Sequence, residues 1–199
     1  MRLFSYIVTH DTGFSPNPFW GRCTLANCRP VIRRTARVGD WIVRLTPKHS
    51  GNRVVFAMEV DEILDYASYY RDQRFENKIP AYNKEEVYKV GDNIYRPLPN
   101  GRFRQLRSMH SNGVQENPET KAHDLGGVNV LIGTRFHYFG GCGPDLPRGL
   151  NVLRVGRGHK NQFSPITISN FLKFISSYPQ GIIAPPTKWV LFHKSCMIS

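Results

Sequence analysis

The sequence predicts an α+β fold, most simply a small mixed β-barrel with helices inserted between its strands. Five or so segments have the periodicity or the apolar character of strands, and helical spacing of apolar residues is confined to segments between or after them. The chain has 199 residues, 40% hydrophobic and 21% charged, which excludes disorder, a collagen helix and a coiled coil as descriptions of the whole chain. One domain over residues 1–199 is expected.

The first part of the chain contains three predicted strands. Residues 2–9 are apolar on both faces, as in a central strand, whereas residues 10–21 combine Pro and Gly with polar side chains, as in a loop. A proline that suits a first helical turn precedes a short predicted helix over residues 31–36. Residues 40–46 and 53–64 are predicted strands, and the turn residues between them indicate a hairpin.

The middle of the chain is predicted to be more irregular. Residues 65–74 are expected to be helical. Residues 93–98 and 102–106 flank a Pro-Asn-Gly turn and predict a basic β-hairpin. Residues 108–127 are polar and are expected to form a mobile loop, and residues 128–139 have the apolar character of a strong strand.

The last part of the chain contains the clearest helix signal. Residues 151–155 are a predicted short strand. Ser164 and Pro165 form an N-cap and first-turn pair, and apolar residues follow at helical spacing, so a C-terminal helix is expected over residues 165–177.

The N-terminus and the cysteine content indicate a cytoplasmic protein with no membrane partner. No apolar run approaches the ~20 residues that a spanning helix needs, and the opening residues are too few and too polar for a signal peptide. Four cysteines are too few for a disulfide framework.

Positive charge is concentrated in three segments. The net charge is +12, and residues 22–53, 93–115 and 151–199 have an excess of seven, four and six positive charges, while the remainder is net negative. Dense positive charge favours a polyanion, because each neutralised phosphate releases condensed counterion. Aromatic residues in or beside these segments can stack on bases. Nucleic acid is therefore the expected partner, against the alternative of a solvated basic surface.

Several small clusters have residue types that carry chemistry. Cys23 and Cys28 have a spacing compatible with zinc, but no second close pair completes a site, so no metal and no cofactor are predicted. Cys142 lies in a glycine-rich turn near His137. Cysteine and histidine are the two residue types that a Cys-His nucleophilic site needs. His110 lies in the polar loop.

Two further clusters contain histidine. His123 precedes Asp124, and an adjacent carboxylate can orient a histidine for proton transfer. His159 lies in a basic, glycine-hinged segment before the C-terminal helix, a setting suited to holding phosphate. The catalytic candidates are therefore His110, His137, His159 and Cys142. For each of them, a turn, a packed thiol or a solvated loop is the simpler explanation.

Segments from the first 160 residues form a distinctive set of motifs. They are Asp11-Thr12-Gly13-Phe14, Pro16-Asn17-Pro18-Phe19-Trp20-Gly21, Cys23-Thr24-Leu25-Ala26, Cys28-Arg29-Pro30, Ile32-Arg33, Gly39-Asp40-Trp41, Asp72-Gln73-Arg74-Phe75, Lys78-Ile79-Pro80, Gly91-Asp92-Asn93-Ile94-Tyr95, His110-Ser111, Val130-Leu131-Ile132, Phe136-His137-Tyr138-Phe139-Gly140 and Arg157-Gly158-His159. Together they resemble the nucleotide modification associated domain, type 2, of bacteria and phages. The resemblance implies a context of DNA modification and brings no established catalytic residues with it.

A looser similarity concerns the fold. The order of helix, Val38-Gly39-Asp40, strand and second strand resembles the barrel of PUA-like domains, including the EVE and ASCH types. That resemblance implies a mixed PUA-like β-barrel with inserted helices, and a pocket lined by aromatic side chains that holds a modified or flipped base.

The leading hypothesis is a nucleic-acid-binding domain that recognises a modified or flipped base in DNA. Stacking and base-edge contacts are assigned to Asn17, Trp20, Thr24, Trp41, Tyr66, Tyr69, Phe75 and Asn93. Phosphate contacts are assigned to Arg33, Arg74, Arg104 and Arg157. The alternatives are an enzyme that modifies a nucleobase or nucleotide, and a basic protein-interaction module. Neither the base nor the oligomeric state follows from the sequence.

Overall fold

The computed structural model describes residues 1–189, in which the chain forms two compact units. Unit 1 consists of residues 1–12, residues 37–61 and the chain from residue 133 onward. Unit 2 consists of residues 13–36 and 62–132. Each unit is therefore built from segments that are far apart in the sequence.

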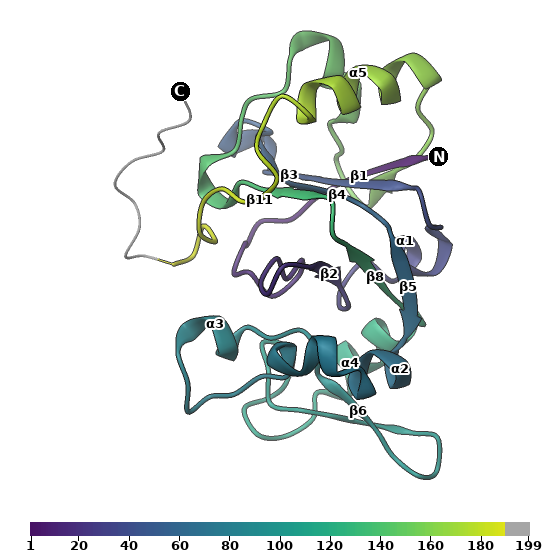
Figure 1. Ribbon diagram of the computed structural model, residues 1–199, viewed down its shortest axis with the longest axis vertical. Coiled ribbons are helices and arrows are strands. Elements are labelled where there is room, and N and C mark those ends of the chain that lie inside the picture. Colours follow the sequence, from purple (N-terminus) through teal and green to yellow (C-terminus); the bar gives the residue numbers. More distant parts are fainter. Residues whose placement is uncertain (190–199) are drawn as a thin grey trace. The chain divides into compact units, whose positions relative to one another are not determined.

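Unit 1 is organised around a six-stranded sheet (Figure 1). In spatial order its strands are β10 (His159–Lys160), β1 (Leu3–Ile7), β3 (Trp41–Leu45), β4 (Val54–Glu59), β9 (Phe136–Tyr138) and β11 (Gly181–Ile182). β1 pairs with β3 in parallel, and β3 pairs with β4 as the predicted antiparallel hairpin. β1 is a central strand, as its apolar residues on both faces predict.

Helix α5 (Pro165–Ile175) lies against this sheet and confirms the predicted C-terminal helix (Figure 1). The Ser164 side chain accepts a hydrogen bond from the Thr167 amide and caps the first turn. Phe171, which is fully buried, contacts the Trp41 ring edge to face at 6.3 Å. The core of unit 1 therefore lies between α5 and the sheet.

The prediction of a short strand at residues 151–155 is wrong. Residues Arg148–Leu153 form a 3₁₀ helix that begins after Pro147. Leu150 and Leu153, three residues apart, are both buried in the core, which a helical turn permits and a strand would not.

Unit 2 contains two small sheets and short helices. β2 (Cys23–Leu25), β8 (Asn129–Gly133) and β5 (Glu62–Asp65) form one sheet with β8 in the middle. β6 (Tyr95–Pro97) and β7 (Phe103–Gln105) form the predicted basic hairpin. The helical segments are α1 (Pro30–Thr35), α2 (Tyr66–Arg71), the 3₁₀ helix Gln73–Lys78, α3 (Glu86–Lys89) and α4 (Pro118–Leu125).

The α+β class is confirmed, but residues 1–189 contain no closed barrel, and the PUA-like barrel is not confirmed. The strands predicted at residues 53–64 and 128–139 are each interrupted, and their two halves join different sheets. Asp61 and Thr134 lie at the two interruptions, and the Asp61 carboxylate accepts hydrogen bonds from the amide and hydroxyl of Thr134. These side-chain bonds replace strand pairing where the chain changes sheets.

The loop predicted at residues 108–127 is also wrong in its second half, because it contains α4. The Asn117 side chain accepts hydrogen bonds from the amides of Glu119 and Thr120, and Pro118 occupies the first turn. The helix is polar, so its apolar periodicity is weak and the start signal alone marks it.

The longest helix of residues 1–189, α5, has 11 residues. Within this part of the chain no helix combines the length and apolar character that crossing a membrane requires.

Candidate active site

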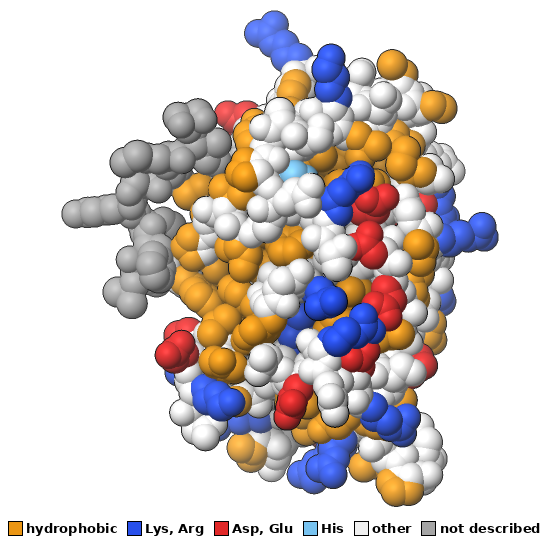
Figure 2. Space-filling view, in the orientation of Figure 1, with side chains coloured by type: hydrophobic (Ala, Val, Ile, Leu, Met, Phe, Trp, Pro, Cys, Tyr) orange, Lys and Arg blue, Asp and Glu red, His pale blue; other side chains and the backbone are white. Residues whose placement is uncertain are grey.

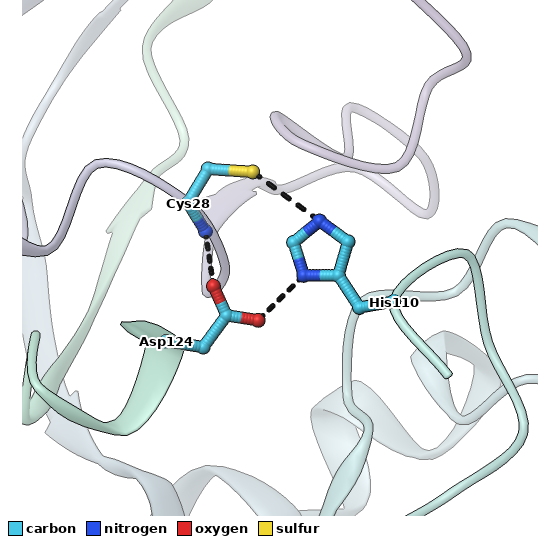
Figure 3. A group of neighbouring side chains, drawn as sticks. All are labelled: Cys28, His110 and Asp124. Atoms are coloured by element: carbon cyan, nitrogen blue, oxygen red, sulfur yellow. Dashed lines mark hydrogen bonds and ion pairs between the residues drawn. The ribbon is translucent and has the colours of Figure 1, made fainter. Parts of the chain in front are cut away.

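Three side chains of unit 2, those of Cys28, His110 and Asp124, form a connected group (Figure 3). The Cys28 Sγ lies 3.5 Å from Nε2 of His110, and Nδ1 of His110 lies 2.6 Å from Oδ2 of Asp124. Cys28 precedes α1, His110 lies between β7 and α4, and Asp124 lies in the last turn of α4. The imidazole ring therefore stands between the sulfur and the carboxylate.

The backbone at Cys28 adopts a conformation that side chains rarely tolerate. Cys28 has φ 59° and Arg29 has φ 43°, both in the left-handed region. Residues held in this region cost roughly 1–3 kcal/mol each and persist where the surrounding structure over-determines them. Here the Cys28 amide donates a 2.7 Å hydrogen bond to Oδ1 of Asp124. The carboxylate thus holds the cysteine backbone as well as the histidine ring.

The Asp124 carboxylate is completely buried and is satisfied by three donors. Besides His110 and the Cys28 amide, the Tyr95 hydroxyl donates to Oδ2 at 2.8 Å. Burial alone raises the pKa of this carboxyl, but the hydrogen bond and charge of His110, the Cys28 amide and Tyr95 outweigh it, so the pKa of Asp124 is lowered. Asp124 is therefore ionised at neutral pH.

His110 is positively charged at neutral pH. Its side chain is 20% exposed, and the edge of the ring meets the Phe14 ring at a centroid distance of 4.8 Å. Burial lowers the pKa of His110, but the hydrogen bonds and charges of Asp124 and Cys28 offset that effect and raise the pKa to about 10. The partly exposed Cys28 sulfur therefore lies beside a positively charged ring, and reactive cysteines are found in partly exposed surroundings of this kind.

Arg33 connects the backbone on both sides of this group. Its side chain is fully buried, and its Nε donates to the carbonyl oxygen of Cys28 at 2.7 Å. Its terminal nitrogens donate to the carbonyl oxygens of Asn129, at 2.8 Å, and Asp124, and to the Tyr66 hydroxyl, at 2.5 Å. Because one rigid guanidinium holds both the Cys28 and the Asp124 backbone, Arg33 is a positioning residue for the pair.

Gly127 makes room for the Arg33 guanidinium. A Cβ atom on Gly127 would lie 2.4 Å from Cζ of Arg33, closer than side chains approach one another. Gly127 directly follows the end of α4, and its lack of a side chain is therefore part of how Arg33 reaches the Asp124 carbonyl.

The group also contains ligand types that metal ions use. The sulfur, a ring nitrogen and a carboxylate oxygen lie within 4.8 Å of one another. However, Cys28 and Asp124 contact opposite nitrogens of the ring, and a histidine gives a metal ion only one of them. A bound ion would have to break one of these two contacts, so the geometry suits a proton relay better than a metal centre.

The residues predicted to read a base edge are buried in unit 2 and have partners there. Asn17 and Thr24 pair through their backbones, and the Lys78 ammonium donates to Oδ1 of Asn17 at 2.6 Å. Thr24 donates to the buried carboxylate of Asp92 at 2.7 Å. Asn93 donates to the backbone carbonyl oxygens of Tyr69 and Phe75. A role for Asn17, Thr24 and Asn93 in base recognition stays a prediction. It would require these side chains to replace their hydrogen bonds within the protein by hydrogen bonds to a base.

Burial also governs the charge of this polar cluster. Burial lowers the pKa of Lys78 to about 8, against the opposing effect of Asp92, and burial raises the pKa of Asp92. The Tyr69 hydroxyl donates to Asp92 at 2.7 Å. The cluster is internally satisfied, as a buried polar network must be.

Most of the rings predicted to stack on a base are packed inside the units. Trp41 lies in the core of unit 1. Tyr66 is 5% exposed, and Tyr69 and Phe75 are buried against each other at 4.6 Å. Trp20 differs, because it keeps exposed surface beside the Tyr88 ring at 5.4 Å. A stacking role for these rings stays a prediction, for which Trp20 is the most accessible.

The four predicted phosphate ligands have different surroundings. Arg33 is committed to the contacts described above. Arg74 is exposed but forms ion pairs with Glu62 and Asp72. Arg104 on β7 and Arg157 in unit 1 are exposed. Phosphate binding by these arginines stays a prediction.

Of the predicted catalytic candidates, His110 lies in the connected group. His137 is buried in β9, where its Nδ1 donates to the Pro179 carbonyl oxygen at 2.8 Å. His159 lies in β10 beside the Phe4 ring. Cys142 is disulfide-bonded and is not a free thiol. Cys28 as a nucleophile lies outside the sequence prediction, where it appeared only as a zinc ligand.

The charge segregation along the sequence does not produce one basic patch on the face seen in Figure 2. Lys and Arg side chains are spread over that face, and Asp and Glu side chains lie among them. The expectation of a polyanion partner is therefore supported by the net positive charge of the chain and not by a continuous basic surface on the face seen in Figure 2.

Comparison with known proteins identifies the family of this chain. A search of curated proteins and a search of solved structures each found no match. The model of the family described as "Nucleotide modification associated domain 2" matches residues 1–193, which is nearly the whole chain. The motifs of the sequence and this match agree, and the chain belongs to the nucleotide modification associated domain 2 family.

Proposed function

We propose that this chain is an enzyme that modifies a nucleobase or a nucleotide through a covalent bond to Cys28. The observation that carries the proposal is the hydrogen-bonded connection from Asp124 through His110 to the Cys28 sulfur. Nucleophilic cysteines are activated by a histidine that a third group orients. The family description supports nucleotide modification as the context of the reaction.

The connection of the three groups suggests the steps. The Cys28 thiolate attacks an electrophilic carbon of the substrate and forms a carbon–sulfur bond, and Nε2 of His110 gives its proton to the leaving group. An acceptor, either water or a second substrate, then attacks the same carbon and loses a proton to His110. The carbon–sulfur bond breaks and the thiolate returns. Asp124 stays ionised throughout and stabilises the imidazolium.

The proposed substrate is a nucleic acid or a nucleotide. The net charge of +12 favours a phosphate-bearing ligand, and the exposed arginines of the β6–β7 hairpin lie in the same unit as Cys28. Binding of DNA with a modified or flipped base is the finer form of this proposal.

A second candidate function is recognition of such a base without chemistry. The partly exposed Trp20 beside Tyr88 favours it, because adjacent rings of this kind can stack on a base. The two functions differ in what Cys28 does, which makes Cys28→Ser the discriminating variant.

The decisive measurement combines nucleoside and protein mass. Wild-type protein incubated with DNA and nucleotides should change the mass of a nucleoside or add mass to the peptide that contains Cys28, and Cys28→Ser should do neither while still binding DNA. If wild-type and Cys28→Ser protein bind DNA equally and no mass changes in either, base recognition without chemistry is the function and the enzyme proposal is wrong.

The reactivity of the thiol should depend on His110. At pH 7 we expect iodoacetamide to alkylate Cys28 roughly 10-fold more slowly in His110→Gln, because the variant removes the positively charged ring that lies 3.5 Å from the sulfur. Peptide mass spectrometry measures the rate, with the buried Cys23 as an internal reference. His123→Gln, an exposed neighbour of Asp124, is the control and should not change it. Equal alkylation rates in all three proteins would contradict the activation of Cys28 by His110.

The stability of the fold should depend on pH through the same histidine. The pKa of His110 is about 10 in the folded protein against 6.5 for an unperturbed histidine, so its contribution is complete below pH 6.5 and is lost as pH rises toward 10. In urea unfolding, the difference between wild type and His110→Gln should therefore be largest at pH 5.5–6.5 and shrink by at most roughly 1.4 kcal/mol per pH unit above it. A difference that grows with pH would have the wrong sign.

Arg33→Lys should destabilise the fold and alter the reactivity of Cys28, although the substitution keeps the positive charge. A lysine cannot reach four acceptors in one plane, so we expect a loss of roughly 3–5 kcal/mol in unfolding free energy and a shifted pH profile of Cys28 alkylation. Arg34→Lys is the matched control, because Arg34 is exposed and its one side-chain hydrogen bond within residues 1–189 is to the Gly126 carbonyl oxygen at 2.8 Å. An unchanged alkylation profile in a folded Arg33→Lys protein would assign Arg33 to stability alone.

A further inference from the structure

A second polar site lies in unit 1 and does not involve Cys28. It is a cavity of about 220 Å³ between the chain after β1, the end of β3, the turn after it and the segment at residue 187. Its lining includes three basic side chains, those of Arg44, Arg53 and Lys188, and the hydroxyls of Thr9, Thr46 and Thr187. The cavity is smaller than the roughly 300–1,000 Å³ typical of drug-sized ligands, but it is several times the ~30 Å³ of a water molecule. It is sized for a small polar group.

Arg44 forms the deepest basic part of the lining. Its side chain is 1% exposed, which is unusual for arginine. One terminal nitrogen donates to Oδ1 of Asp11 at 3.0 Å, and the other donates to the His10 carbonyl oxygen at 2.7 Å. The Nε atom is buried and has no hydrogen-bond partner among residues 1–189. A buried donor without a protein partner is commonly explained by a bound water or ion.

Asp11, the acidic residue of the lining, is fully occupied by protein donors. Its Oδ1 accepts from Arg44 and from the Tyr138 hydroxyl, at 2.7 Å. Its Oδ2 accepts from the amide and the hydroxyl of Thr187, at 3.1 and 3.2 Å. Asp11 therefore balances the charge of Arg44 and fixes the wall of the cavity, and it offers no acceptor for a cation.

The other two basic side chains leave the cavity positive. Arg53 bonds Asp145 at 3.3 Å, but the two side chains are 52% and 75% exposed, so water weakens this pair. Lys188 is exposed and has no ion pair with any residue in the described part of the chain. The Thr46 and Thr187 hydroxyls already donate to the Ser50 carbonyl oxygen and to Asp11. A ligand that entered would thus meet two exchangeable cations, the Thr9 hydroxyl and the buried guanidinium.

We propose that this cavity binds a phosphate group, carried by a nucleotide or by a nucleic acid. A phosphate has several strong acceptor oxygens, which match a guanidinium fork, an ammonium and a hydroxyl donor arranged around one space. Arg53 exchanges its contact with exposed Asp145 for the phosphate, and Lys188 adds a second charge. The site supplies phosphate recognition in unit 1, and it stands whether or not Cys28 is a nucleophile.

The test measures binding to the full chain by isothermal titration calorimetry. The probes are inorganic phosphate, thymidine monophosphate, thymidine and a short single-stranded oligonucleotide. We expect phosphate to bind and the monophosphate to bind at least ~10-fold more tightly than thymidine, which lacks the charge. The oligonucleotide distinguishes the sources: an internal phosphodiester that binds like the monophosphate indicates nucleic acid, whereas weaker binding indicates a terminal phosphate on a nucleotide.

The variants locate the site and separate it from general charge. Arg53→Gln combined with Lys188→Gln should weaken monophosphate binding about 10-fold, since two charged contacts are removed. Arg154→Gln combined with Lys173→Gln removes the same charge from exposed positions outside the cavity and should leave binding unchanged. All four side chains are exposed, so both variants should fold.

Three results would overturn the proposal: no phosphate-dependent binding by the wild type, equal weakening in the two double variants, or binding that survives in the cavity variant. Cys28→Ser should bind the monophosphate as the wild type does, so loss of nucleotide modification and loss of phosphate binding are separate outcomes.

Discussion

The buried carboxylate of Asp124 is the constraint on which the candidate active site depends. It holds the His110 ring at one oxygen and the Cys28 amide at the other, so a single charged group sets both the orientation of the histidine and the left-handed backbone of the cysteine. A buried carboxylate without donors would cost several kcal/mol, and this requirement couples the three residues. Arg33 completes the arrangement by binding the backbone that carries Cys28 and Asp124.

Much of the secondary structure follows from local signals, but the topology does not. The N-terminal strand, the β3–β4 hairpin, the β6–β7 hairpin and α5 were predictable because periodicity, turn residues and caps lie within a few residues of one another. The PUA-like barrel is not confirmed, because two predicted strands divide between sheets. At that division Thr134 donates a hydrogen bond to Asp61, which is 73 residues away. No local pattern encodes such a pairing.

The site was predictable only in part, for the same reason. The sequence indicates His110 as a candidate and places Asp124 beside His123, but Cys28 lies 82 residues from His110 and 96 from Asp124. Asn117 and Pro118 carry the same start signal as Ser164 and Pro165, so α4 was detectable from its cap even though its apolar periodicity is weak. Recognising α4 would have placed Asp124 on an ordered element, although not beside a thiol.

Each structural feature of the Cys28 site also occurs at sites with no chemical role. The combination of these features at one cysteine is what favours a catalytic role over a purely structural one. A satisfied buried carboxylate can be structural, and so can a left-handed residue next to a helix. Here the strained backbone, the ionised carboxylate and the charged histidine converge on one partly exposed sulfur. Recognition of a base does not need a charged histidine beside a thiol, whereas nucleophilic catalysis by cysteine uses a histidine that a third group orients. The rings assigned to base stacking show the opposite pattern, because most of them are buried where packing alone accounts for them.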